Sequence, residues 1–213
     1  MRILNAIGGI AVQTLNKRYR QVPPFGRETI RRFTENPSAM RKLAARDFED
    51  LLQVSASWYI DSEVAHHLPQ CALPVFEDLL PTQKENTILR RLLFDLATWH
   101  AYAKLRLHTD TTLNDFRMAT STLGRSVRVF IKEVCPQYNT TELPHQMAAR
   151  GRRQAALTKN SKTPSVTQRK LKSTHKKLNL STYKYHALGD YPDLISRFGT
   201  SDNASTQTVI IFS

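Results

Sequence analysis

The most regular pattern of apolar and polar positions lies in residues 82 to 107 and predicts a long amphipathic helix. At helical spacing its apolar side chains fall within an arc of roughly 140°, the width of a stripe that faces a protein core. The stripe consists of Ile88, Leu89, Leu92, Leu93, Leu96, Trp99, His100, Ala103 and Leu107. Thr82 and Glu85 have the spacing of a capping box, which satisfies backbone donors of a first helical turn. We therefore expect the helix to begin there.

Residues 112 to 134 show a second such pattern, with a narrower apolar arc of roughly 80°. This arc consists of Leu113, Phe116, Thr120, Leu123, Val127, Phe130, Ile131 and Val134. Residues 108 to 111 leave room only for a short connector, so the two predicted helices should be antiparallel neighbours, a helical hairpin. Gly124, at the edge of the arc, indicates a close approach by another segment.

The chain before the hairpin gives weaker patterns. Residues 3 to 19 fit a helix that Gly8-Gly9 would weaken. Asn36-Pro37 is a helix start signal, and the apolar positions of residues 40 to 52 follow it on one face. Residues 54 to 70 follow neither a helical nor a strand period, so they are expected to form an irregular insert.

Cys71 resumes an apolar run that would continue the helix of residues 40 to 52 if the insert were removed, and Pro74 is expected to end that helix.

The chain after the hairpin is mostly polar. A basic helix is expected at residues 145 to 157, and residues 158 to 177 contain too few apolar side chains to fold, so we expect disorder there. Ser181 begins a short helix that Gly189 ends, and Tyr191-Pro192 begins another that ends at Gly199. The last residues have the composition of a strand.

These patterns predict a mainly α fold, a small irregular helical bundle around an antiparallel helical hairpin, with a basic disordered linker and short C-terminal helices. The expected organisation has four parts. They are residues 1–25, a poorly defined N-terminal segment; 26–142, the helical core with its insert at 54–70; 143–180, the basic and largely disordered linker; and 181–213, short helices and an apolar tail.

Positive charge is concentrated in one segment. The chain has 31 Lys and Arg against 18 Asp and Glu, a net charge of +13, and 11 of these charges lie in residues 143 to 189, which contain no acid. Such a segment can neutralise phosphates and release counterions, which predicts sequence-independent nucleic-acid binding. The candidate binding residues are Arg150, Arg152, Arg153, Arg169, Lys170, Lys172, Lys176 and Lys177.

Tyr183, Tyr185 and Tyr191 follow the basic segment and have rings on which bases can stack. Residues 169 to 177 also suit a nuclear-import signal. A lysine-rich linker that only stays solvated is an equal alternative, and the sequence favours neither.

Other classes of site find little support. The sequence shows no paired carboxylates, no nucleophile with a base and no phosphate-binding glycine loop at usable spacing. His66 and His67 with Cys71 and Asp61 match no type of metal site, and nothing indicates a cofactor. Cys71 and Cys135 do not form a disulfide framework, which favours a reduced intracellular compartment. Neither a signal peptide nor a membrane span is expected.

Five blocks of sequence, in order, carry a family resemblance. They read VPPFGRETIRRF, KLAARDFEDLLQ with CALPVFEDLLP, LATWHAYAKLRLHT, ELPHQMAARGRRQAA and STYKYHALGDYPDLISRFGTSDNASTQ. They resemble the C-terminal part of the fungal transposase-like proteins called Plavaka, related to the Kyakuja-Dileera-Zisupton and CACTA groups. The resemblance covers residues 17 to 208 and implies descent from a transposase with an RNase H-like core, whose acidic residues hold metal ions for strand cleavage.

The chain departs from the family pattern at two junctions. Family members read LLQ directly into CxxPVFE, where this chain has seventeen extra residues, 54 to 70. They also continue after DNxSTQ into a GELEH-like segment that supplies an acid, where this chain ends with residues 209 to 213. Both extra pieces begin with valine, whose codons start with GT, and the first ends with glutamine, one of whose codons ends with AG. We hypothesise that both are retained intron sequence, which transcript sequencing across the junctions would test.

The resemblance with these departures implies a truncated, non-catalytic fragment of a transposon-derived protein, with at most weak nonspecific nucleic-acid binding through the basic segment. The catalytic acids of the family are expected to be missing, so the chain is not expected to be an enzyme. Two alternatives stay open. The fragment completes a DNA transposase supplied by a longer homologous chain, or it is an inert translated relic.

Overall fold

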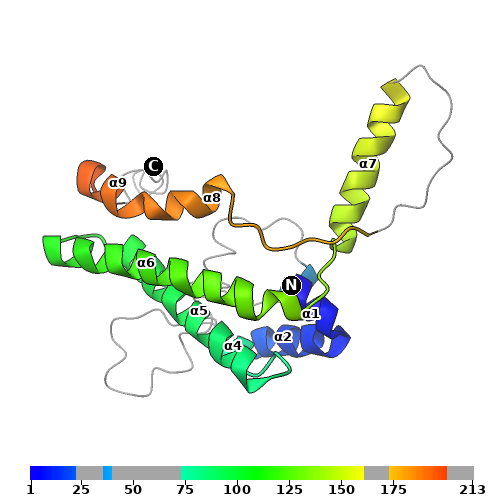
Figure 1. The fold of residues 1–213 in the computed structure, drawn as a ribbon, viewed down its shortest axis with the longest axis horizontal. Coiled ribbons are helices and arrows are strands. Elements are labelled where there is room, and N and C mark those ends of the chain that lie inside the picture. Colours follow the sequence, from blue (N-terminus) through cyan, green and yellow to red (C-terminus); the bar gives the residue numbers. More distant parts are fainter. Residues whose placement is uncertain (23–35, 40–72, 161–172, 201–213) are drawn as a thin grey trace, which may run out of the picture.

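Two antiparallel helices, α5 (Gln83–Ala103) and α6 (Asp110–Glu133), form the centre of the structure (Figure 1). The computed structural model describes residues 1–22, 36–39, 73–160 and 173–200. Near one end of the pair, Lys84 Nζ lies 2.9 Å from the Glu133 carboxylate, and near the other the Trp99 indole N–H donates to the Thr120 hydroxyl at 3.0 Å. The predicted helical hairpin and mainly α class are confirmed.

Helix α5 begins as the sequence predicts and ends earlier. The backbone N–H of Glu85 donates to the Thr82 hydroxyl at 3.3 Å, and the N–H of Thr82 donates to the Glu85 carboxylate at 3.2 Å, so the capping box is present. The predicted end at Leu107 is wrong. The N–H of Lys104 is shared between the carbonyls of His100 and Ala101, at 3.1 and 3.2 Å, which tightens and ends the last turn. Leu107 is 79% exposed.

Helix α6 begins two residues before the predicted Thr112. Thr109 is its N-cap, and its hydroxyl accepts from the backbone N–H of Thr112 at 3.2 Å while the Thr112 hydroxyl accepts from the N–H of Thr109 at 2.8 Å. This reciprocal pair of threonines stands where the usual capping box has Glu or Gln. The sequence pattern missed it because residues 109–111 lie before the apolar arc.

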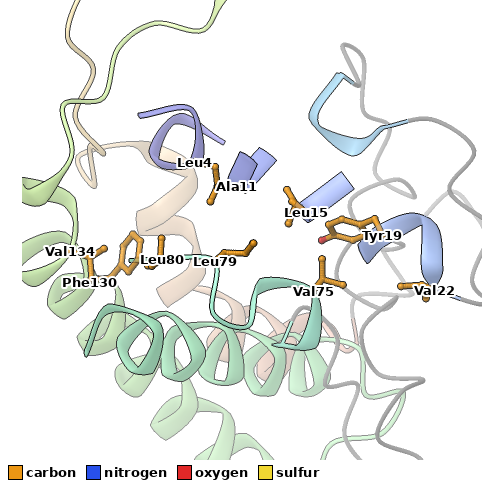
Figure 2. Packing of buried hydrophobic residues seen from close by; sticks show 10 residues of the cluster. All are labelled: Leu4, Ala11, Leu15, Tyr19, Val22, Val75, Leu79, Leu80, Phe130 and Val134. Atoms are coloured by element: carbon orange, nitrogen blue, oxygen red, sulfur yellow. The ribbon is translucent and has the colours of Figure 1, made fainter. Parts of the chain in front are cut away.

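The N-terminal helices α1 (Arg2–Ile7) and α2 (Gly9–Gln21) cover one end of the hairpin. Their buried side chains meet those of the segment before α5 and of the α6 C-terminus (Figure 2). This first core consists of Leu4, Ala11, Leu15, Tyr19, Val22, Val75, Leu79, Leu80, Phe130 and Val134. Five of these ten residues precede position 25, so this part of the chain is integral to the bundle.

The short helix α4 (Leu73–Phe76) joins the same core, and it corrects the expectation for Pro74. Pro74 lies within the first turn of α4, where a proline needs no backbone partner, and does not end a helix. The Arg18 guanidinium donates to the carbonyls of Val75, at 3.1 Å, and Glu77. The Tyr19 and Phe76 rings meet edge to face with centroids 6.3 Å apart. These contacts join α4 to α2.

The C-terminal elements α8 (Tyr183–His186), η4 (Ala187–Gly189) and α9 (Tyr191–Phe198) lie against the other end of α6 (Figure 1). The second core there consists of Trp99, Ala103, Phe116, Leu123 and Ile195. The two predicted C-terminal helices are therefore present, and Gly199 ends α9 with φ 85° as expected. The N-cap of α8 is Thr182 rather than Ser181.

Helix α7 (Pro144–Asn160) follows α6 and η3 (Cys135–Gln137) and points away from the bundle (Figure 1). It includes the whole basic helix expected at residues 145–157 and continues through residues 158–160, where the expectation of disorder is wrong. None of the described helices is long and apolar enough to cross a membrane.

The remaining expectations fall partly or wholly outside the described residues. Asn36-Pro37 leads into η1 (Pro37–Ala39), whose Ser38 hydroxyl accepts from the buried Asn16 amide at 2.7 Å. The expected helix at 40–52, the insert at 54–70 and the apolar tail at 209–213 lie outside the part of the chain that the structure describes.

Gly8→Ala is expected to lower the free energy of unfolding by about 1 to 3 kcal/mol. Gly8 separates α1 from α2 with φ 132° and ψ 170°, a conformation available almost only to glycine. Gly9→Ala is the matched control. A Cβ at Gly9 meets nothing within 4 Å, and Gly9 starts a helix, so this change is expected to be neutral or stabilising by up to about 1 kcal/mol. Urea unfolding followed by circular dichroism measures both, and equal losses would contradict the assignment.

Candidate nucleic-acid interface

Helix α7 carries positive side chains and no acid. Arg152 and Arg153 are exposed on it. The helix points away from the hairpin (Figure 1), and within the described residues neither arginine forms an ion pair with an acidic side chain. Both guanidinium groups are therefore available to phosphate oxygens, which they bind in a planar two-pronged geometry.

The base of α7 is held by Glu142, whose side chain is only 5% exposed. The Arg150 Nε and Nη2 atoms both donate to Glu142 Oε2, at 3.2 and 2.8 Å. Lys176 Nζ lies 3.7 Å from Glu142 Oε1. The hydrogen bond from Arg150 is the main cause that holds the pKa of Glu142 below its usual range, and bonds from Thr174 act in the same direction. The carboxylate therefore stays ionised at neutral pH and keeps the two cations in place.

Residues 173–177 are paired with the chain that leads into α7. The Glu142 N–H donates to the Thr174 carbonyl and the Lys176 N–H donates to the Thr140 carbonyl, each at 2.9 Å, around an antiparallel bridge between Thr141 and His175. The expectation of disorder is therefore wrong for residues 173–177, since backbone hydrogen bonds supply the order that apolar burial does not. We call α7 together with residues 173–177 the basic arm.

The eight predicted binding residues fall into three groups. Arg150 and Lys176 share the single carboxylate of Glu142, so one of their two positive charges is balanced within the protein. Arg152, Arg153 and Lys177 are exposed. The third group lies outside the residues that the structure describes and consists of Arg169, Lys170 and Lys172.

A further row of cations on α6 was not among the predicted site residues. Arg125, Arg128 and Lys132 are exposed and follow one another at intervals of three and four residues, so they share one side of the helix. Arg117, on the same helix, is instead paired with Asp193 at 3.1 Å. The helical spacing was visible in the sequence, but it could not show which arginines have acidic partners.

Tyr185 ties the C-terminal segment to this side of α6. Its hydroxyl donates to the Gly124 carbonyl at 3.4 Å. A Cβ added at Gly124 would meet Arg128 Nη1 at 3.4 Å and the Tyr185 hydroxyl at 3.8 Å, so the guanidinium and the phenol lie near the same point. Another segment does contact α6 at Gly124, as expected, but at ordinary van der Waals distances that would also admit a Cβ.

The three tyrosines proposed for base stacking differ in the structure. The Tyr191 ring packs edge to face against Trp99 with centroids 5.2 Å apart, and Tyr185 is half-buried at Gly124. Tyr183 is 84% exposed. Tyr191 is 37% exposed, so Tyr183 is the most exposed of the three.

In the described part of the chain, no group of three or more His, Cys, Asp or Glu side chains is placed to hold a metal ion. The candidates His66, His67, Cys71 and Asp61 lie outside it. Cys135 is a free thiol whose pKa is raised by burial, which disfavours the reactive thiolate.

No protein-family model, curated protein or solved structure matches this chain. The resemblance to Plavaka transposases therefore stays a prediction from the sequence blocks.

Proposed function

We propose that this protein binds nucleic acid without sequence preference, through the phosphate backbone, and that it does so as a non-catalytic, transposon-derived fragment. The observation that carries the proposal is the basic arm, in which a helix without acids presents Arg152 and Arg153 away from the bundle. The Plavaka resemblance supports the same class of partner.

The ion pairs of Glu142 with Arg150 and Lys176 fix the base of the basic arm. Arg150 and Lys176 join α7 to residues 173–177 through one carboxylate. A helix fixed at one end loses less conformational entropy on binding than a free basic tail does. Folding of the arm has therefore already ordered part of the segment that would bind the nucleic acid.

Arg152→Gln with Arg153→Gln is expected to weaken binding to a random duplex and to reduce its dependence on salt. Each phosphate contact contributes about 0.9 to the slope of log affinity against log salt concentration, so losing two lowers the slope by up to about 1.8. Fluorescence anisotropy of a labelled duplex, titrated between about 50 and 200 mM salt, measures this.

The matched control is Lys17→Gln with Arg20→Gln, which removes the same charge from exposed positions of α2. It is expected to leave the slope close to that of the unmodified chain. Equal slopes for the arm variant and the unmodified chain, or an equal reduction in the control, would show that the arm is not the binding surface.

A further inference from the structure

We infer that Tyr183 is a base-stacking platform and that the protein's preferred partner is therefore a single-stranded nucleic acid. This rests on the proposed function and names the class of nucleic acid. The starting observation is the Tyr183 side chain, which is 84% exposed at the first position of α8. A single exposed aromatic residue is ordinary on a protein surface, so the inference depends on what surrounds it.

The surroundings of Tyr183 are positively charged. Lys184 follows it directly, Lys177 precedes it in the same acid-free segment, and both are exposed. Arg128 of α6 lies near the Tyr185 hydroxyl at Gly124, and Tyr183, two residues earlier in α8, lies on the other side of that helical turn. Exposed cations therefore flank the exposed Tyr183 along the chain.

The ring is also carried by a fixed element. The N–H groups of Tyr185 and His186 donate to the Thr182 carbonyl at 3.0 and 3.2 Å, which forms the turn of α8. The Tyr185 hydroxyl holds this turn to α6, and Leu188, just beyond it, packs against the second core. Tyr183 therefore lies on a turn whose C-terminal side is fixed to the bundle before any ligand binds.

Residues 177–184 connect this platform to the basic arm. At one end Lys176 is paired with the chain before α7, and at the other Tyr185 contacts α6. Figure 1 shows this segment passing from the base of α7 to α8. A strand of nucleic acid that follows it meets arm cations first and the ring of Tyr183 afterwards.

The combination of a basic path and an exposed ring favours single strands. Bases in a duplex are stacked on one another and offer only their edges, whereas an unpaired base can place its face on a tyrosine ring. Loss of one stacked base costs about 5-fold to 100-fold in affinity for a single strand. A duplex, held by its phosphates alone, is not expected to respond to the loss of the ring.

The test compares Tyr183→Ala, Tyr183→Phe and Phe198→Ala in the full chain, with labelled oligothymidylate and a random duplex as probes. Tyr183→Ala is expected to weaken binding of oligothymidylate by at least about 5-fold and to leave duplex binding within about 2-fold. Tyr183→Phe keeps the ring and is expected to bind like the unmodified chain. Phe198, 73% exposed on α9, is the matched exposed aromatic residue, and its removal is expected to have no effect.

Three results would overturn the inference. Unchanged oligothymidylate binding by Tyr183→Ala, with the arm variant still weakened, rejects stacking and leaves the proposed function standing. Equal weakening for oligothymidylate and duplex rejects the preference for single strands. No binding of either probe by the unmodified chain rejects the proposed function and the inference together. Far-ultraviolet circular dichroism of each variant confirms that the comparison is between folded proteins.

Discussion

Phe116→Ala is expected to lower the free energy of unfolding by about 3 to 5 kcal/mol. Phe116 has an exposed fraction of 0%. The rings of Trp99, Tyr102 and His108 surround it, with centroids 5.5, 5.9 and 6.1 Å away. These neighbours belong to α5 and the connector, so the truncated side chain leaves a cavity between the two helices of the hairpin. The lost contacts and the cavity both contribute to the cost.

Urea unfolding followed by circular dichroism at the helical band measures the loss. Met118→Ala, two positions further along α6 and 63% exposed, is the control and is expected to change stability by less than about 0.5 kcal/mol. Phe116→Leu removes less volume and should lie between the two. A loss below about 1 kcal/mol for Phe116→Ala would contradict the packing of the second core.

Asn86→Ala is expected to cost about 2 to 4 kcal/mol. Asn86 is 6% exposed and holds both backbone groups of Leu80. Its side-chain oxygen accepts from the Leu80 N–H at 2.9 Å, and its amide donates to the Leu80 carbonyl at 2.8 Å. Leu80 is itself 5% exposed, so alanine leaves a buried donor and a buried acceptor without partners.

Asn86→Asp separates this hydrogen-bond effect from a simple loss of packing. Aspartate has nearly the same shape and can still accept from the Leu80 N–H, but it places an oxygen against the Leu80 carbonyl and is expected to destabilise at least as much as alanine. Thr87→Ala, at the next position and exposed, is the control and should stay within about 0.5 kcal/mol. A stability of Asn86→Asp close to that of the unmodified chain would contradict the assigned bonds.

The hairpin was predictable because its signals are local. The capping box at the start of α5 joins Thr82 to Glu85, only three positions apart. The apolar positions of α6 follow one helical arc. Residues close together in the sequence therefore determine where α5 begins and which side of α6 is apolar. Helix α9 was recognised for the same reason, from Pro192 in its first turn and Gly199 at its end. The end of α5 was not, because Leu107 continues the apolar period although the chain must already turn to reach Thr109.

For the candidate site, the sequence predicted the segment that carries the excess positive charge, but not which of its cations have acidic partners. The absence of acids between residues 143 and 189 located the basic segment, and the structure agrees that Arg152 and Arg153 are exposed. That Arg150 is engaged by Glu142 depends on a contact across eight residues and a turn. The pairing of Lys176 with Thr140 spans 36 residues and has no local signal.

The sequence by itself determined the positions of the main helices and the excess of positive charge, because helix propensity, capping and net charge depend on residues within a few positions of one another. Tertiary structure alone decided which polar groups are buried and which cations are available. Asp95, in the middle of α5, is 6% exposed, and its carboxylate accepts a hydrogen bond from the Ser126 hydroxyl of α6. Tyr183 is open while Tyr185 and Tyr191 are used in packing. The contacts of Asp95, Tyr185 and Tyr191 each require a partner from another element, and only the folded chain brings the two together.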